Sequence, residues 1–112
     1  MAAGTYNLVI DQGSDFGFEF VVKEDGVAKD LTGYSARGQL RRKKTSPNIS
    51  GTFTCTITDA ANGTGTVSMD NTTTTSLTPG WEYYDVELYT AGDSYVERIL
   101  EGRVEIRAEV TR

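Results

Sequence analysis

The sequence contains no histidine. Histidine is the usual general base of enzymes and the commonest transition-metal ligand, so its absence excludes the familiar catalytic triads. The carboxylates lack the spacing of a calcium-binding loop, and no glycine-rich turn has the strand-to-helix setting of a phosphate loop. We therefore expect no catalytic residue, no metal site and no cofactor, and predict that the protein is not an enzyme.

Cysteine is scarce as well, because Cys55 is the single one. A lone cysteine cannot form an internal disulfide, and residues 1–7 lack the basic start and apolar stretch of a signal peptide. No apolar run approaches the roughly 20 residues that span a bilayer. We expect synthesis and folding in a reducing cytosol, no membrane partner, and a Cys55 that packs inward as a small hydrophobe.

Positive charge is in short supply: 11 lysines and arginines stand against 16 carboxylates, for a formal charge of −5. Such a balance disfavours nucleic acid as a partner. The one concentration of cations comprises Arg37, Arg41, Arg42, Lys43 and Lys44, and no aromatic residue interleaves it. We predict that Arg37, Arg41, Arg42 and Lys43 dock onto another protein; the alternative is an exposed strand end that protects a sheet edge.

Aromatic and β-branched residues are abundant, and they alternate with polar ones in several segments. This period of two predicts half-buried strands, and Asp-Gly, Asn-Gly and Pro-Gly pairs between them predict turns. The pattern favours one all-β domain over residues 1–112, an antiparallel β-sandwich of about seven or eight strands. The expected inward residues include Phe16, Phe18, Phe20, Val22, Tyr34, Ala36, Leu40, Phe53, Cys55, Ile57, Val67 and Met69.

The segment 81–90 is the most aromatic of these strands. Tyr84, Val86 and Leu88 share one face, which we assign to the core, so Tyr83 and Tyr89 face outward. Outward tyrosines often anchor interfaces, although two amphipathic residues at the rim of a core strand would look the same. The segments 95–101 and 102–110 are predicted as two final strands, the second with Val104, Ile106, Ala108 and Val110 inward.

The turn and core residues also resemble those of known proteins. The segments GSDF (13–16), DLTGYSARGQLR (30–41), LTPGWEYYDVEL (77–88) and RILEGRVEI (98–106) are similar to small tailed-bacteriophage virion proteins. The arrangement also resembles the immunoglobulin-like N-terminal domain of phage baseplate upper proteins. This resemblance implies an immunoglobulin-like sandwich and a non-enzymatic structural role.

The resemblance implies a place in the virion, in the tail or baseplate or as a fibre-attachment adaptor. Its partners would be other virion proteins, with the chain present in many copies or as a homo-oligomer. Because no fibre or receptor-binding region follows the sandwich, we expect an adaptor rather than direct host recognition. A capsid decoration protein and, from the aromatic strand, a carbohydrate-binding module are the alternatives.

Overall fold

The computed structural model describes residues 3–111, and they form the expected all-β sandwich. The longer strands are β2 (Leu8–Asp11), β3 (Phe16–Val21), β6 (Ser35–Arg41), β7 (Gly51–Asp59), β8 (Thr64–Met69), β9 (Gly80–Tyr89) and β10 (Val96–Arg107). The two-residue strands are β1 (Gly4–Thr5), β4 (Lys23–Glu24) and β5 (Val27–Ala28), and the short helices are η1 (Ala60–Asn62), α1 (Asn71–Thr75) and η2 (Ala91–Asp93). The expected seven or eight strands thus correspond to seven longer strands, to which the structure adds these three short ones.

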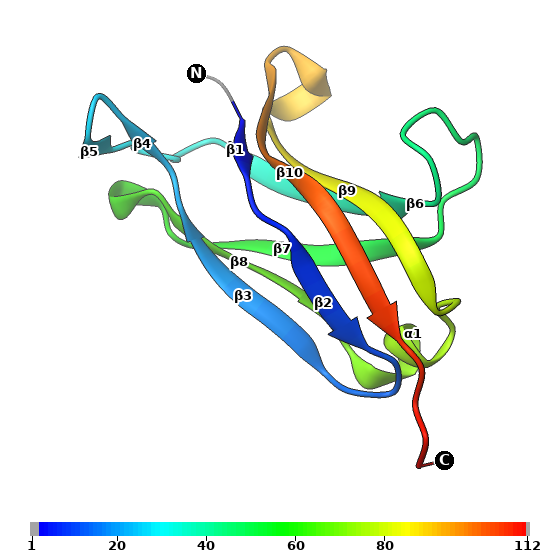
Figure 1. Cartoon of the computed structure of the whole chain (residues 1–112). Helices are drawn as coiled ribbons and strands as arrows, with labels where there is room; N and C mark the ends of the chain where they lie inside the picture. Colours follow the sequence, from blue (N-terminus) through cyan, green and yellow to red (C-terminus); the bar gives the residue numbers. More distant parts are fainter. Residues whose placement is uncertain (1–2, 112) are drawn as a thin grey trace.

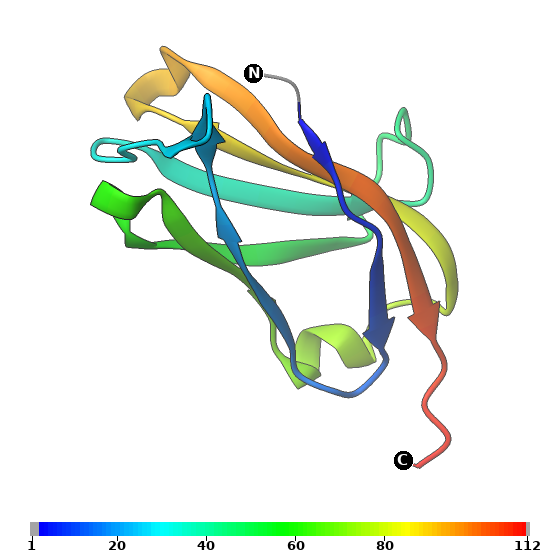
Figure 2. The ribbon, with the colours of Figure 1, turned by 60° about the vertical axis from the view of Figure 1, so that its left-hand side comes forward.

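The strands lie in two facing layers (Figures 1 and 2). One layer has the order β2, β10, β9, β6, with β1 beside β10, and the other has the order β3, β8, β7. Strand β7 joins the layers, because Gly51–Phe53 pairs with β6 and the stretch from Thr54 to Asp59 pairs with β8. A strand that changes sheet in this way closes the sandwich at one corner.

The pairings are antiparallel, except that β1 and β2 run parallel to β10. The parallel contact places Leu8 beside Val104 and Ile10 beside Ile106, and all four side chains are buried. The N-terminal strand therefore covers the edge of the layer that β10 would otherwise leave open.

The predicted alternation is confirmed along the longer strands. In β9, Tyr84, Val86 and Leu88 are buried and the residues between them are half-buried. Cys55 lies against the core as expected, and burial raises the pKa of its thiol to about 11. The core is built from the inward faces of both layers, so the surface for contacts is provided by outward faces and loops.

The prediction for the last strand is wrong in two respects. Residues 96–107 form one strand with a register shift between Arg98 and Leu100, rather than two strands. Ala108 and Val110 lie beyond it and are exposed, Val110 by 92%. The neighbouring strand β2 ends at Asp11, the partner of Arg107, so no strand remains to cover the residues that follow.

Local hydrogen bonds explain the short elements. Asp25 and Gly26 have φ values of 52° and 78°, the left-handed conformation that a two-residue hairpin between β4 and β5 requires. Asp70 begins α1 because its carboxylate accepts the Thr73 N–H at 2.8 Å. The three helices are brief, and within residues 3–111 none has the length and apolar composition needed to cross a membrane.

Candidate functional site

The outward face of β6, β9 and β10, here called the outer face, carries most of the predicted interface residues. Along β9 the outward side chains are Trp81, Tyr83, Asp85, Glu87 and Tyr89. The strand register places β10 beside all five of them and β6 beside the four from Tyr83 to Tyr89, so these four lie in rows across three strands. Aromatic residues thus occupy both ends of the β9 row and carboxylates its middle.

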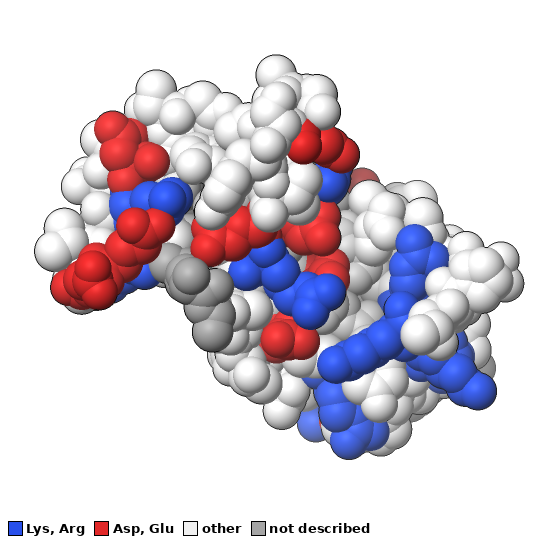
Figure 3. Space-filling view, turned by 90° about the horizontal axis from the view of Figure 1, so that it is seen from above, with Lys and Arg blue, Asp and Glu red and all other residues white. Residues whose placement is uncertain are grey.

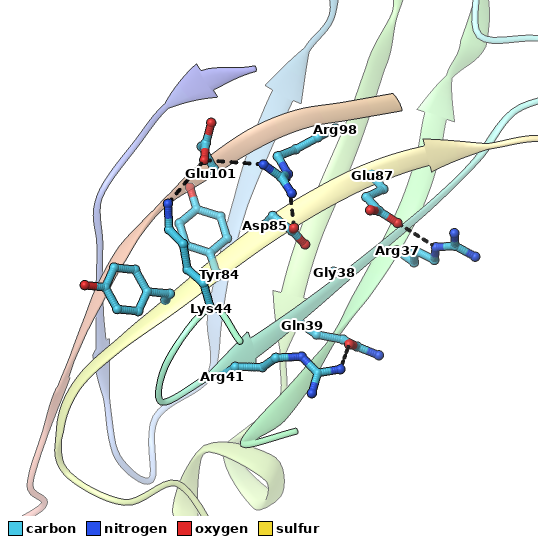
Figure 4. Close-up of a pocket in the computed structure, with 11 residues that line it drawn as sticks. Arg37, Gly38, Gln39, Arg41, Lys44, Tyr84, Asp85, Glu87, Arg98 and Glu101 are labelled. Carbon is cyan, nitrogen blue, oxygen red and sulfur yellow. Dashed lines mark hydrogen bonds and ion pairs between the residues drawn. The ribbon is translucent and has the colours of Figure 1, made fainter. Parts of the chain in front are cut away.

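Arg37 of β6 connects one carboxylate of this row to a hairpin. Its Nε donates to Glu87 Oε1 at 3.0 Å, and its Nη1 donates to Asp93 Oδ1 at 3.2 Å. These two hydrogen bonds raise the pKa of Arg37. Figure 4 shows the Arg37–Glu87 pair reaching from β6 to β9. The charge of Arg37, a predicted docking residue, is therefore already paired with carboxylates of the same chain.

A second group of charges crosses from β9 to β10 and to the β6–β7 loop. Arg98 Nε lies 3.2 Å from Asp85 Oδ2, and Glu101 lies 3.7 Å from Arg98 and 3.8 Å from Lys44 (Figure 4). Burial, with a further contribution from Glu87, raises the pKa of Asp85 despite the nearby arginine. Partly exposed pairs of this kind contribute little stability, and their main effect is to orient long side chains.

Each aromatic side chain on this face lies next to a cation. The Arg37 guanidinium is 4.4 Å from the Tyr89 ring centroid, and the Lys44 ammonium is 5.7 Å from that of Tyr83. Arg103 is 4.5 Å from the Trp81 ring, which remains 50% exposed. Tyr83 and Tyr89 face outward as predicted but are half-buried rather than fully exposed. Their use as anchors remains a prediction.

The predicted basic cluster is divided: Arg37 lies apart, paired with Glu87 and Asp93, whereas Arg41 to Lys44 follow one another at the end of β6 and in the β6–β7 connection. Arg41 donates to the Ser46 carbonyl at 2.8 Å and to Gln39 Oε1 at 3.1 Å, while Arg42 donates to the Trp81 carbonyl at 3.2 Å. Lys43 makes no side-chain ion pair or hydrogen bond with another residue in the range 3–111. The structure thus assigns local contacts to both arginines, and their docking role remains untested.

A shallow groove of about 470 Å³ runs over the outer face. It is lined by Arg37, Gly38, Gln39, Arg41, Lys44, Tyr83, Tyr84, Asp85, Glu87, Arg98 and Glu101 (Figure 4). Cations and carboxylates line it together, which suits side chains of a protein partner better than one small anion. Within residues 3–111, no group of three or more cysteine, aspartate or glutamate side chains is arranged to hold a metal ion.

Comparison with known families matches this fold. The family profile of LtfC-like β-sandwich domains covers residues 3–107. The chain belongs to the LtfC-like β-sandwich domain family. LtfC is a phage tail fibre-related protein, so the expected phage-related β-sandwich is supported, while the narrower resemblance to baseplate upper proteins remains a prediction.

Other comparisons add little to this LtfC-like assignment. No curated protein matches the sequence significantly. Among solved structures, a family 123 glycoside hydrolase from Clostridium perfringens, described in a study of glycolipid glycan hydrolysis, aligns with a TM-score of 0.45 and 13% identity. The alignment covers 97% of this chain and 24% of the hydrolase chain.

One notable residue of this LtfC-like domain escaped prediction. Glu82 is 1% exposed, and its Oε1 has no hydrogen-bond partner among residues 3–111. Its Oε2 lies 3.7 Å from the Arg42 Nη2. Glu82 alternates in step with Tyr84 and Val86 along β9, so the period of the strand could have placed it on the inward face. No pattern in the sequence indicates its pairing with Arg42, which is distant in sequence.

Proposed function

We propose that this LtfC-like domain is a structural part of a phage virion and docks with other virion proteins through its outer face. It acts in the tail or baseplate, or as an adaptor that attaches a fibre, and it catalyses no reaction. The observation that supports docking is the row of three aromatic rings on β9, each beside a cation. Tryptophan, tyrosine and arginine dominate the energetic centres of protein interfaces.

The arrangement of charges favours a protein partner. Arg37 and Arg98 already pair with carboxylates, so a polyanion would have to compete with these contacts. Side chains that are oriented before binding lose less conformational entropy on binding. A partner with its own mixed charges can add to such a network without dismantling it.

The carbohydrate-binding alternative requires an aromatic ring that is open to a sugar. Trp81 is half exposed, but Arg103 lies 4.5 Å from its ring centroid and occupies one approach to it. Tyr83 lies beside Lys44 in the same way. These contacts favour protein docking over a sugar platform.

The test is immunogold electron microscopy of purified virions with antibodies against the chain. Label at the tail or baseplate is expected; label on the capsid would replace this proposal with a decoration role, and absence from particles would refute both.

In a complementation assay, Trp81→Ala should lower incorporation at least about tenfold. Val21→Ala is the matched control, because Val21 is also 50% exposed but lies on β3 in the other layer, and it should incorporate normally.

A glycan array tests the alternative directly. Specific binding of the wild-type chain, lost in Trp81→Ala, would favour the carbohydrate-binding module. The docking proposal expects no binding to the array.

A further inference from the structure

The two ends of the sandwich carry opposite charge. Strand β6 runs between them, from Ser35 at one end to Arg41 at the other, and the longest dimension of the molecule is 43 Å. In Figure 3, seen from above, acidic side chains gather at the left end, both signs mix in the middle, and basic side chains gather at the right end. The charge is therefore separated along the molecule although the net charge is negative.

The acidic end comprises the β4–β5 hairpin, the residues that lead from it to β6, and the end of β7 with the β7–β8 connection. Its carboxylates are Glu24, Asp25, Asp30 and Asp59, and two lysines, Lys23 and Lys29, lie among them. A hydrogen bond from the Leu31 N–H to the Ala60 carbonyl holds these two segments together. The hairpin tip also presents Val27, which is 69% exposed. This end thus combines an acidic surface with an apolar contact point.

The basic end comprises Arg41, the last residue of β6, and the β6–β7 connection. It carries Arg41, Arg42, Lys43 and Lys44, and Ile49 in the same loop is 48% exposed. The nearby carboxylates belong to Glu82, which is buried, and to Glu101, which is 3.8 Å from Lys44. This end therefore mirrors the acidic end, with cations around an exposed aliphatic side chain.

At each end one charge of the sign that dominates there remains uncommitted within the described residues, and at the acidic end Lys23 is uncommitted too. Lys29 Nζ neutralises Glu24 Oε1 at 2.6 Å, and the Asp30 carboxylate accepts from Thr32 at 2.9 Å. Asp25 at the hairpin tip and Lys43 in the basic loop have no such partner among residues 3–111. These two residues are the strongest candidates for a contact with another molecule.

We propose that the acidic end of one copy docks on the basic end of a second copy, in a head-to-tail contact. A contact between like ends would bring charges of one sign together, which is unfavourable, whereas unlike ends bring Asp25 toward Lys43 and Val27 toward Ile49. The contact is heterologous, so copies add in a row or close into a ring. This deepens the docking role proposed above and rests on it for its place in the virion.

Sedimentation velocity of the purified chain at about 20 mM salt is the test, because screening is weak there. The wild type should self-associate as its concentration rises, and about 300 mM salt should weaken this markedly. Lys43→Glu and Asp25→Lys should each weaken self-association at least about tenfold. Glu19→Lys, an equal charge reversal at an exposed position in the middle of β3, should associate at least as strongly as the wild type.

An equimolar mixture of Lys43→Glu and Asp25→Lys chains is the decisive sample. Each variant keeps one intact end, and the two altered ends carry exchanged charges that attract each other, so the mixture should recover the self-association that neither variant shows alone. Asp25→Asn tolerates the left-handed turn and serves as a second variant if Asp25→Lys disturbs the hairpin; far-UV circular dichroism checks the fold of each.

A wild type that stays monomeric at low salt would overturn the proposal, and so would a mixture that self-associates no more strongly than its components. These results leave the virion role untouched, because immunogold labelling tests that separately. Conversely, a self-associating chain that is absent from particles would refute the virion role alone.

Discussion

Replacing Arg42 with alanine removes the ion-pair partner of a buried carboxylate. Glu82 is 1% exposed, and the Arg42 Nη2 is 3.7 Å from its Oε2. Removing one partner of a buried pair costs about 3–5 kcal/mol, because the other charge stays buried without compensation. The Arg42 side chain is 45% exposed, so water screens part of this interaction. We therefore expect a loss of about 2–3 kcal/mol in unfolding free energy.

A double-mutant cycle separates the charge effect from lost packing. Glu82→Gln keeps the shape of the side chain and removes its charge, so Arg42→Ala in that background should cost less than about 1 kcal/mol. The coupling between the two positions is then about 2 kcal/mol. Lys43→Ala is the matched control, since this neighbouring cation pairs with no described residue, and it should change stability by less than about 0.5 kcal/mol.

Urea unfolding at pH 7 measures all four variants. The single tryptophan, Trp81, reports by fluorescence, and far-UV circular dichroism gives an independent second signal. If Arg42→Ala proves as mild as Lys43→Ala, Glu82 does not depend on Arg42. A full loss that persists in the Glu82→Gln background would mean that the arginine acts through packing and its hydrogen bond to the Trp81 carbonyl.

Three further predictions concern single residues. Burial raises the pKa of Cys55 to about 11, so Ellman's reagent at pH 8 should react about a hundredfold more slowly with the native chain than with the urea-unfolded one; equal rates would contradict its burial. Hydrogen bonds from the Thr73 hydroxyl and N–H lower the pKa of Asp70; the resulting stability is present above the unfolded pKa and is lost as pH falls through the folded pKa, so the urea midpoints of Asp70→Ala and wild type should converge in acid. A Cβ on Gly102 would lie 2.4 Å from the Tyr6 carbonyl oxygen, so Gly102→Ala should cost about 1–3 kcal/mol in urea unfolding; Gly17→Ala, whose Cβ would meet ordinary contacts at 3.5 Å, is the control and should cost clearly less.

Alternation in the sequence was enough to assign the faces of the longer strands. Phe53 and Cys55 point inward as predicted, and Asp-Gly at residues 25–26 forms the expected hairpin. These features depend on neighbours in sequence, whose spacing alone decides which face each side chain occupies.

Features that depend on distant pairing were not predictable in the same way. The parallel contact of β2 with β10 joins the two ends of the chain, and no local pattern marks it. For the same reason the sequence pattern wrongly places Val110 in the last strand. That strand ends at Arg107, which pairs with the last residue of β2. The partners of Arg42 and Arg103 likewise come from strands that only the folded sheet brings near.

The parallel pairing of β2 with β10 has a mechanical consequence. A pull that draws the two ends of the chain apart slides these strands past each other, because they run in the same direction and the ends lie at opposite ends of the pair (Figure 1). Their hydrogen bonds then bear the load together instead of opening one at a time like a zipper. A domain loaded in this way should resist a high force and break within a small extension.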